Sequence, residues 1–136
     1  MPTSVRFEQV TAPEAPEFPG NIFSNCLKAG NQVILAGMVA SDDSGGVIGG
    51  DSAYEQARAC FQKIQKLVEA AGGSLADVAK LTIYLTDIAD RPGIGRARKE
   101  FFDGRMPAST LIGVSALAEP QYKVEIEAIA ILEGDG

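Results

Sequence analysis

The pattern of residues 122–132 constrains the fold more than any other part of this chain. Side chains there alternate in character, which is the period of a β-strand. One set of alternate positions is apolar throughout: Val124, Ile126, Ala128 and Ala130. The other set begins with two carboxylates and then becomes apolar: Glu125, Glu127, Ile129 and Ile131. The segment is therefore predicted to be a strand with one face in the core and an opposite face that is apolar at one end only.

Residues 52–71 are predicted to form an amphipathic helix. Ser52 and Glu55 have the spacing of a capping box, in which a hydroxyl and a carboxylate each accept a hydrogen bond from a backbone N–H of the first turn. Gly72 and Gly73 follow, and glycine readily adopts the left-handed conformation that ends a helix. Apolar residues recur at steps of three and four, which places them on one side: Ala53, Ala57, Cys60, Phe61, Ile64, Leu67, Val68 and Ala71.

Shorter segments complete an α+β pattern. A second helix is expected from Pro92, a residue suited to the first turn of a helix, through Phe102. Residues 41–51 contain four glycines but lack the Gly-Lys-Ser/Thr ending of a phosphate-binding loop, so they are predicted to be a plain loop. Further strands are expected over residues 5–10, 23–28, 32–36, 80–86 and 110–114.

Two helices and about six strands pack most simply as one sheet with both helices on the same face. A chain of 136 residues fits a single domain, here residues 1–136. The other sheet face then has no helix to cover it, although Ile129 and Ile131 lie on it. An uncovered apolar face predicts contact with another subunit.

Composition restricts the chemistry. A net charge of -6 argues against a nucleic-acid partner, which needs a basic surface. The chain has no histidine, the commonest acid–base group and transition-metal ligand, and no metal site is expected. No apolar run approaches the ~18 residues of a membrane span, and the first residues do not resemble a signal peptide. Cys26 and Cys60 are expected to be buried thiols of a cytoplasmic protein.

Five segments carry a resemblance to known proteins: residues 30–37, 70–78, 80–85, 107–110 and 124–130, the last being Val-Glu-Ile-Glu-Ala-Ile-Ala. Together they resemble the Rid family, also called the YjgF family. The resemblance implies a chorismate-mutase-like fold that assembles as a homotrimer, with a central barrel of sheets and a cleft at each subunit interface. It also implies hydrolysis of enamines or imines, such as those derived from 2-aminoacrylate, to a keto compound and ammonia without a metal or organic cofactor.

The resemblance assigns roles to five positions. Glu125 matches the family's glutamate that helps to place the attacking water. Ser109 stands where an arginine usually clamps the substrate carboxylate, and Leu111 stands where a cysteine often follows. Phe23 replaces a tyrosine of the cleft, and Ala36 replaces a serine. Serine cannot form the paired hydrogen bonds by which a guanidinium grips a carboxylate. Phe23 and Ala36 make the pocket more apolar, so a larger or less polar substrate is expected, such as an aminomuconate-like ring-cleavage product.

These residues also have ordinary structural interpretations. Glu125 can be a solvated carboxylate of a strand or an ion-pair partner between subunits. Ser109 can be a simple strand residue, and Phe23 can belong to the core or to a pocket wall. The thiol of Cys26 has no histidine to activate it and is expected to be structural.

Three arginines near Ser109 are open to two interpretations. Arg96 and Arg98 lie on the expected second helix, and Arg105 lies shortly before Ser109. A solvated surface is the usual place for such side chains. Alternatively, Arg105 or Arg96 supplies a displaced carboxylate clamp.

The sequence therefore favours a cytoplasmic homotrimeric hydrolase of an enamine or imine, with Glu125 and Ser109 as catalytic candidates. A binding or regulatory module, or a tautomerase, of the same fold is the first alternative, because the clamping arginine is absent. A ribonuclease or translation-inhibitor role is the second alternative, and the net charge of -6 disfavours it.

Overall fold

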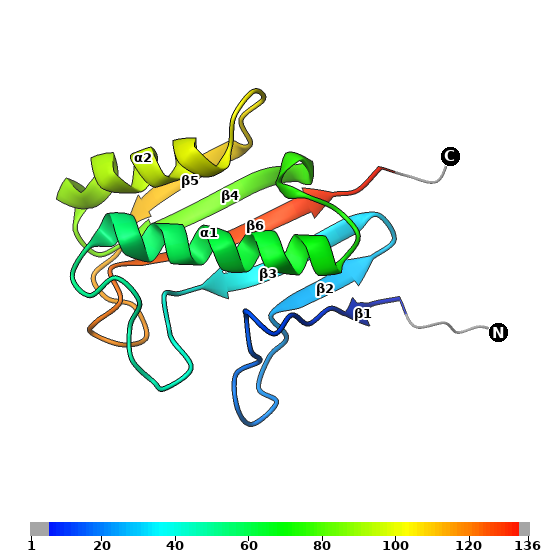
Figure 1. The fold of residues 1–136 in the computed structure, drawn as a ribbon, viewed down its shortest axis with the longest axis horizontal. Helices are drawn as coiled ribbons and strands as arrows, with labels where there is room; N and C mark the ends of the chain where they lie inside the picture. Colours follow the sequence, from blue (N-terminus) through cyan, green and yellow to red (C-terminus); the bar gives the residue numbers. More distant parts are fainter. Residues whose placement is uncertain (1–5, 134–136) are drawn as a thin grey trace.

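The strand β6 (Val124–Ile131) lies near the centre of a six-stranded sheet in the order β1-β2-β3-β6-β4-β5 (Figure 1). The structure is a computed structural model that describes residues 6–133. β6 is antiparallel to both of its neighbours, whereas β4 and β5 are parallel, so the sheet is mixed. The other strands are β1 (Glu8–Gln9), β2 (Cys26–Ala29), β3 (Gln32–Met38), β4 (Val78–Leu85) and β5 (Ala108–Gly113).

Both long helices, α1 (Ala53–Ala70) and α2 (Arg91–Phe101), cover the same face of the sheet (Figure 1). Two short 3-10 turns, η1 (Leu75–Asp77) and η2 (Ile88–Asp90), precede β4 and α2. This arrangement confirms the predicted α+β fold. Neither helix in the described part of the chain is long and apolar enough to cross a membrane.

The predicted stripe of α1 packs against the sheet, and each of its eight residues is buried. The capping box at its start is only half formed. The Ser52 hydroxyl accepts a hydrogen bond from Glu55 N at 3.1 Å, but Ser52 N donates to Gly49 O at 3.0 Å. The backbone N–H of Ser52, which was expected to donate to the Glu55 carboxylate, therefore donates to the turn that precedes the helix. Gly72 has a φ of 101°, as expected of a glycine that ends a helix.

The two faces of the sheet differ as the alternation predicts. Towards the helices, Leu81, Ile83 and Leu85 of β4 are fully buried beside the apolar set of β6. The opposite face has no helix over it, and Ile129 and Ile131 are 38% and 48% exposed there. The uncovered apolar face is thus confirmed, and its contact with another subunit stays a prediction.

Some strand boundaries differ from expectation. The first strand is only Glu8–Gln9, and part of the expected range, residues 1–5, lies outside the described residues. β2 begins at Cys26 rather than at residue 23, because the preceding loop folds back onto Asn25, whose side chain donates to Ala15 O and Pro16 O. β3 continues past Ala36 through an irregularity between Leu35 and Met38.

Candidate functional site

Glu125 and Glu127 lie on the uncovered face of the sheet, two residues apart on β6. Tyr84 of β4 is paired with Glu125 in the strand register, and its hydroxyl donates a hydrogen bond to Glu127 Oε1 at 3.0 Å. This hydrogen bond to the carboxylate is the main cause that raises the pKa of Tyr84. Glu127 is therefore held by a neighbour, and no hydrogen bond from a side chain reaches Glu125 within residues 6–133.

Glu125 lies against the backbone of Gly37 in β3. A β-carbon built on Gly37 would fall 2.7 Å from Cδ and 2.8 Å from Cγ of Glu125, and it would overlap Oε2. The carboxylate can occupy this place only because residue 37 has no side chain. Burial raises the pKa of Glu125, and the charge of Glu127 raises it further. A half-buried carboxylate with increased proton affinity is suited to take up and return a proton.

Ser109 and Leu111 lie on the other face of the sheet. In the parallel register Ser109 is opposite Leu81 and Leu111 is opposite Ile83, and both partners point into the core beneath the helices. Residues paired across strands share a face. Within one chain, Ser109 and Glu125 are therefore separated by the sheet.

The arginine that reaches Ser109 is Arg98. It extends from the last turn of α2, and its Nη1 donates to Ser109 Oγ at 2.9 Å. Arg105 instead donates to Ala76 O at 2.6 Å, beside the start of β4. Arg96 stacks over the ring of Tyr54 at 3.9 Å from its centroid, on the helix layer. Arg105 and Arg96 therefore contact other groups, which lie away from Ser109.

Phe23 and Ala36 lie at the same end of the sheet as Glu125. Ala36 N donates to Asn25 O at 2.8 Å, and Ala36 directly precedes Gly37, on which Glu125 rests. Phe23 is 47% exposed and stacks on Phe18 with ring centroids 5.6 Å apart. Ala36 therefore adjoins in sequence the glycine against which Glu125 lies, and Phe23 is partly exposed. A role for either residue in binding a substrate stays a prediction.

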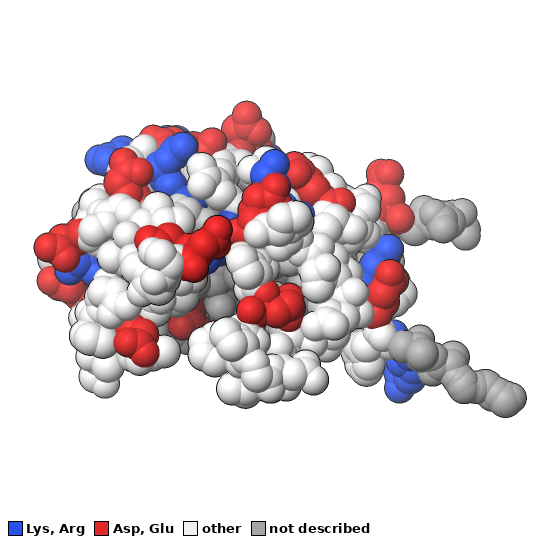
Figure 2. Space-filling view, turned by 60° about the horizontal axis from the view of Figure 1, so that its bottom comes forward, with Lys and Arg blue, Asp and Glu red and all other residues white. Residues whose placement is uncertain are grey.

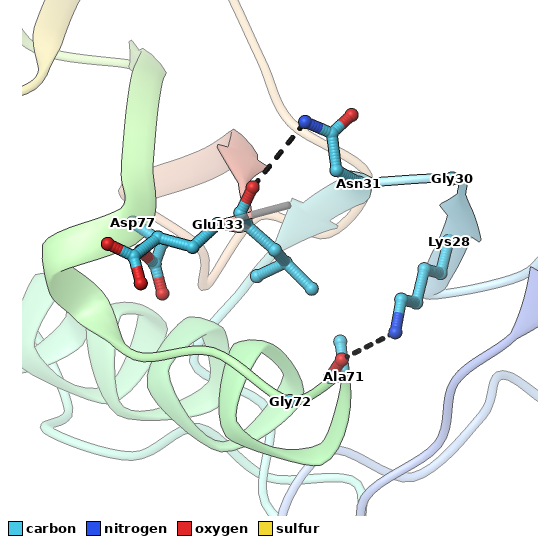
Figure 3. A pocket seen from close by; sticks show the side chains of 8 residues that line it. Lys28, Gly30, Asn31, Ala71, Gly72, Asp77 and Glu133 are labelled. Carbon is cyan, nitrogen blue, oxygen red and sulfur yellow. Dashed lines mark hydrogen bonds between the residues drawn. The ribbon is translucent and has the colours of Figure 1, made fainter. Parts of the chain in front are cut away.

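One hollow in the surface is remote from this region. It has a volume of about 660 Å³ and lies between the end of α1, the β2–β3 turn and the end of β6 (Figure 3). Lys28 Nζ donates to Ala71 O at 3.1 Å there, and Asn31 Nδ2 donates to Leu132 O at 3.4 Å. Asn31 adjoins the end of β6 that lies ~20 Å along the strand from Glu125. None of the candidate residues lines this hollow.

The two thiols are buried, as predicted. Burial raises the pKa of Cys26 to about 11 and that of Cys60 to about 12, so both are protonated at neutral pH and unsuited to nucleophilic attack. In the part of the chain that is described, no three acidic or cysteine side chains are placed to hold a metal ion. On the face drawn in Figure 2, basic side chains lie among acidic ones and form no continuous patch.

Comparison with known proteins places the chain among its relatives. The model of the family described as Endoribonuclease L-PSP matches residues 14–132. A 2-iminobutanoate/2-iminopropanoate deaminase of Dermatophagoides farinae is 31% identical, over 91% of this chain and 95% of that protein.

Two solved structures are also similar. A protein of unknown function from Pseudomonas aeruginosa has a TM-score of 0.84 and 39% identity, covering 95% of this chain and 94% of that one. RidA from the Antarctic bacterium Psychrobacter sp. has a TM-score of 0.83 and 31% identity, covering 92% and 99%. The chain therefore belongs to the Endoribonuclease L-PSP family, which is the YjgF or Rid family.

Proposed function

We propose that this protein is a hydrolytic deaminase that converts a small enamine, through its imine, to a carbonyl compound and ammonia. The observation that carries the proposal is the Glu125 carboxylate, half-buried against Gly37 with its pKa raised. The name of the Dermatophagoides farinae relative, a deaminase of 2-imino acids, supports the same reaction class.

The reaction requires water to be placed and a proton to be moved. An enamine first gains a proton at carbon and becomes an iminium ion. Glu125, helped by backbone carbonyl groups, orients a water molecule and takes its proton as the oxygen bonds to the iminium carbon. Glu125 then passes this proton to nitrogen. The carbon–nitrogen bond breaks and ammonia leaves as the hydroxyl oxygen forms the carbonyl and gives its own proton to Glu125, which releases it to solvent. Acid–base assistance of this kind contributes ~10²–10⁴-fold in rate.

The proposed enzyme is a cytoplasmic homotrimer with its cleft between subunits. The support is the uncovered sheet face, on which Ile34, Ile129 and Ile131 are all more than a third exposed. The apolar character of Phe23 and Ala36 favours a substrate larger than 2-iminopropanoate, for which an aminomuconate-like ring-cleavage product is the specific proposal.

Ammonia release from a panel of enamines and imines, including aminomuconates, tests this function. Glu125→Gln should reduce turnover by ~10²-fold or more, because an amide cannot take a proton from water. Glu127→Gln is the matched control. It keeps an acceptor for the Tyr84 hydroxyl and should change turnover much less. Full activity in both variants, or no ammonia release from any substrate by the unaltered protein, would refute hydrolysis.

A tautomerase or binding module of the same fold is the second candidate. The observation in its favour is Ser109, a neutral side chain that lies across the sheet from Glu125. Conversion of enamine to imine without ammonia release, monitored by ultraviolet absorbance, would identify the tautomerase. Saturable binding with neither reaction would identify the binding module.

A further inference from the structure

Lys63 of α1 is a buried cation that the proposed mechanism does not use. The residue is only 9% exposed. Its Nζ donates to Val39 O at 2.8 Å, and to both Ser41 O and Ser41 Oγ at 2.9 Å. These contacts use all three hydrogens of an ammonium group. Within residues 6–133, no carboxylate lies within ion-pair distance of Lys63. A buried charge is costly unless it is hydrogen-bonded, so the backbone of residues 39–41 stabilises the ammonium group in this place.

The segment that Lys63 binds follows directly on a bulge in β3. Between Leu35 and Met38, β3 advances by three residues (35 to 38), whereas the paired part of β6 advances by two (128 to 126). The extra residue interrupts the ladder and bends the strand locally. Gly37, against which Glu125 lies, is part of this bulge. The position of the Glu125 carboxylate therefore depends on the shape of the bulge.

Two side chains of α1 bind the backbone that follows the bulge. Cys60, one helical turn before Lys63, donates its thiol hydrogen to Met38 O at 3.2 Å. Lys63 binds the next carbonyl, that of Val39, and then that of Ser41. Because β3 ends at Met38, no strand pairing fixes the backbone beyond it. Contacts with α1 hold it instead.

We infer that Lys63, assisted by Cys60, is a positioning residue that fixes the β3 bulge against which the Glu125 carboxylate lies. Both residues act through the backbone, from the helix side of the sheet. The inference rests on the proposed deaminase, in which Glu125 is the base. Without the ammonium group, the carbonyls of residues 39 and 41 would turn towards water. Gly37 would shift with them, and Glu125 would become more solvated and lose its alignment with the attacking water.

The pKa of Glu125 tests the inference without requiring turnover. It is measured by carbon-13 NMR titration of the side-chain carboxyl, whose resonance is assigned by its absence from Glu125→Gln. Lys63→Met retains an apolar stem but removes the ammonium group. The pKa of Glu125 should fall towards that of a solvated glutamate, because burial is the main cause that raises it. Lys66→Met is the matched control. It removes the same charge from an exposed position of α1 and should leave the pKa unchanged.

The direction of the change separates positioning from direct electrostatics. A positive charge favours an ionised carboxylate, so the loss of the Lys63 charge alone would raise the pKa of Glu125 or leave it unchanged. The other ionisable groups around Glu125 are the Glu127 carboxylate, the Tyr84 hydroxyl of β4 and the protonated Cys60 thiol. None of them is altered in Lys63→Met. An unchanged or raised pKa in the folded variant would overturn the inference.

A second pair of variants decides the question if Lys63→Met does not fold. Cys60→Ala removes the donor to Met38 O, whereas Cys60→Ser keeps a donor of similar size. Urea unfolding verifies that both are folded. The pKa of Glu125 should be lower in Cys60→Ala than in Cys60→Ser, and equal values would overturn the inference.

Ammonia release shows whether this positioning matters to the reaction. Turnover of Lys63→Met should fall by ~10²-fold, the cost of misplacing a reacting group by about 1 Å, and Lys66→Met should be as active as the unaltered protein. Full turnover in folded Lys63→Met would overturn the positioning role alone. A lowered pKa of Glu125 in Lys63→Met, together with no ammonia release from any substrate by the unaltered protein, would refute the proposed function and leave the hold of Lys63 on the bulge standing.

Discussion

Gly37→Ala should separate the fold of this protein from its activity. The added β-carbon would lie 2.7 Å from Cδ and 2.8 Å from Cγ of Glu125, whereas ordinary contacts between such atoms exceed about 3.4 Å. The backbone of Gly37 does not have a positive φ, so alanine is compatible with it. The Glu125 side chain must therefore rotate away, and the strands can stay in place.

The expected change in stability is small because two effects oppose each other. Moving Glu125 from its rotamer costs ~0.5–1.5 kcal/mol. Replacing glycine by alanine in an allowed conformation stabilises by ~0.4–1 kcal/mol, through the lower entropy of the unfolded chain. The free energy of unfolding should therefore change by less than ~1 kcal/mol. Activity should fall by ~10²–10⁴-fold, because the displaced carboxylate no longer places the water.

Ammonia release and urea unfolding measure the two quantities on the same preparation. Gly113→Ala in β5 is the matched control, since its β-carbon would lie 3.8 Å from Ile88 Cδ1, an ordinary contact. Its turnover should be unchanged. If Gly37→Ala is folded and as active as the unaltered protein, the position of Glu125 against Gly37 has no part in the reaction.

Two further predictions concern assembly and pH. Light scattering at micromolar concentration should give about three times the chain mass of 14.3 kDa, and Ile129→Lys should reduce it by placing a charge on the uncovered apolar face. A stable monomer of the unaltered protein would contradict the trimer. Glu125→Gln should be more stable than the parent at pH 7. The folded-state pKa of Glu125 is raised, so the folded chain retains the proton at pH values where the unfolded chain has released it, and stability falls as pH rises through that window. The advantage should vanish below about pH 4, where the carboxylate is protonated in both states, and equal stability at pH 7 would contradict the burial of the charge.

The fold could be predicted from the sequence where burial of one side of an element makes apolar residues recur at a regular spacing. The alternation of β6 predicted both faces of the strand, and the stripe of α1 predicted which side of the helix is buried, because each pattern records contact with one core. Local hydrogen bonding was less predictable. The turn at Gly49 binds Ser52 N, and the side chain of Asn25 draws the preceding loop away from β2.

The arginine at Ser109 could not be found from proximity in sequence. Arg105 is closer to Ser109 along the chain, but it lies in the connection before β5 and binds Ala76 O. Arg98 is eleven residues away, yet it contacts Ser109, because α2 is the crossover helix between parallel β4 and β5. The last turn of such a helix passes close to the start of the next strand. Recognising β4, α2 and β5 as one crossover unit would have favoured Arg98.

The hydrogen-bond donor to Glu127 could not be predicted from the sequence either, because it depends on strand register. From sequence, Glu125 and Glu127 were expected only to share one face of the strand. Register is fixed by the packing of whole strands and not by local residue type. Here it places Tyr84 opposite Glu125, and the length of the tyrosine side chain carries its hydroxyl to Glu127.

The division of roles between the two carboxylates follows from these contacts. Glu127 accepts a hydrogen bond from the Tyr84 hydroxyl. Burial raises the pKa of Glu125, and the charge of Glu127 raises it further. Glu125 therefore has an increased affinity for a proton, and it is the group that the proposed reaction requires to gain and lose one. A second subunit seated on the apolar end of the same face would exclude more water and raise the proton affinity of Glu125 further. Assembly and acid–base chemistry would then depend on one surface, and the loss of the trimer would also lower the pKa of Glu125.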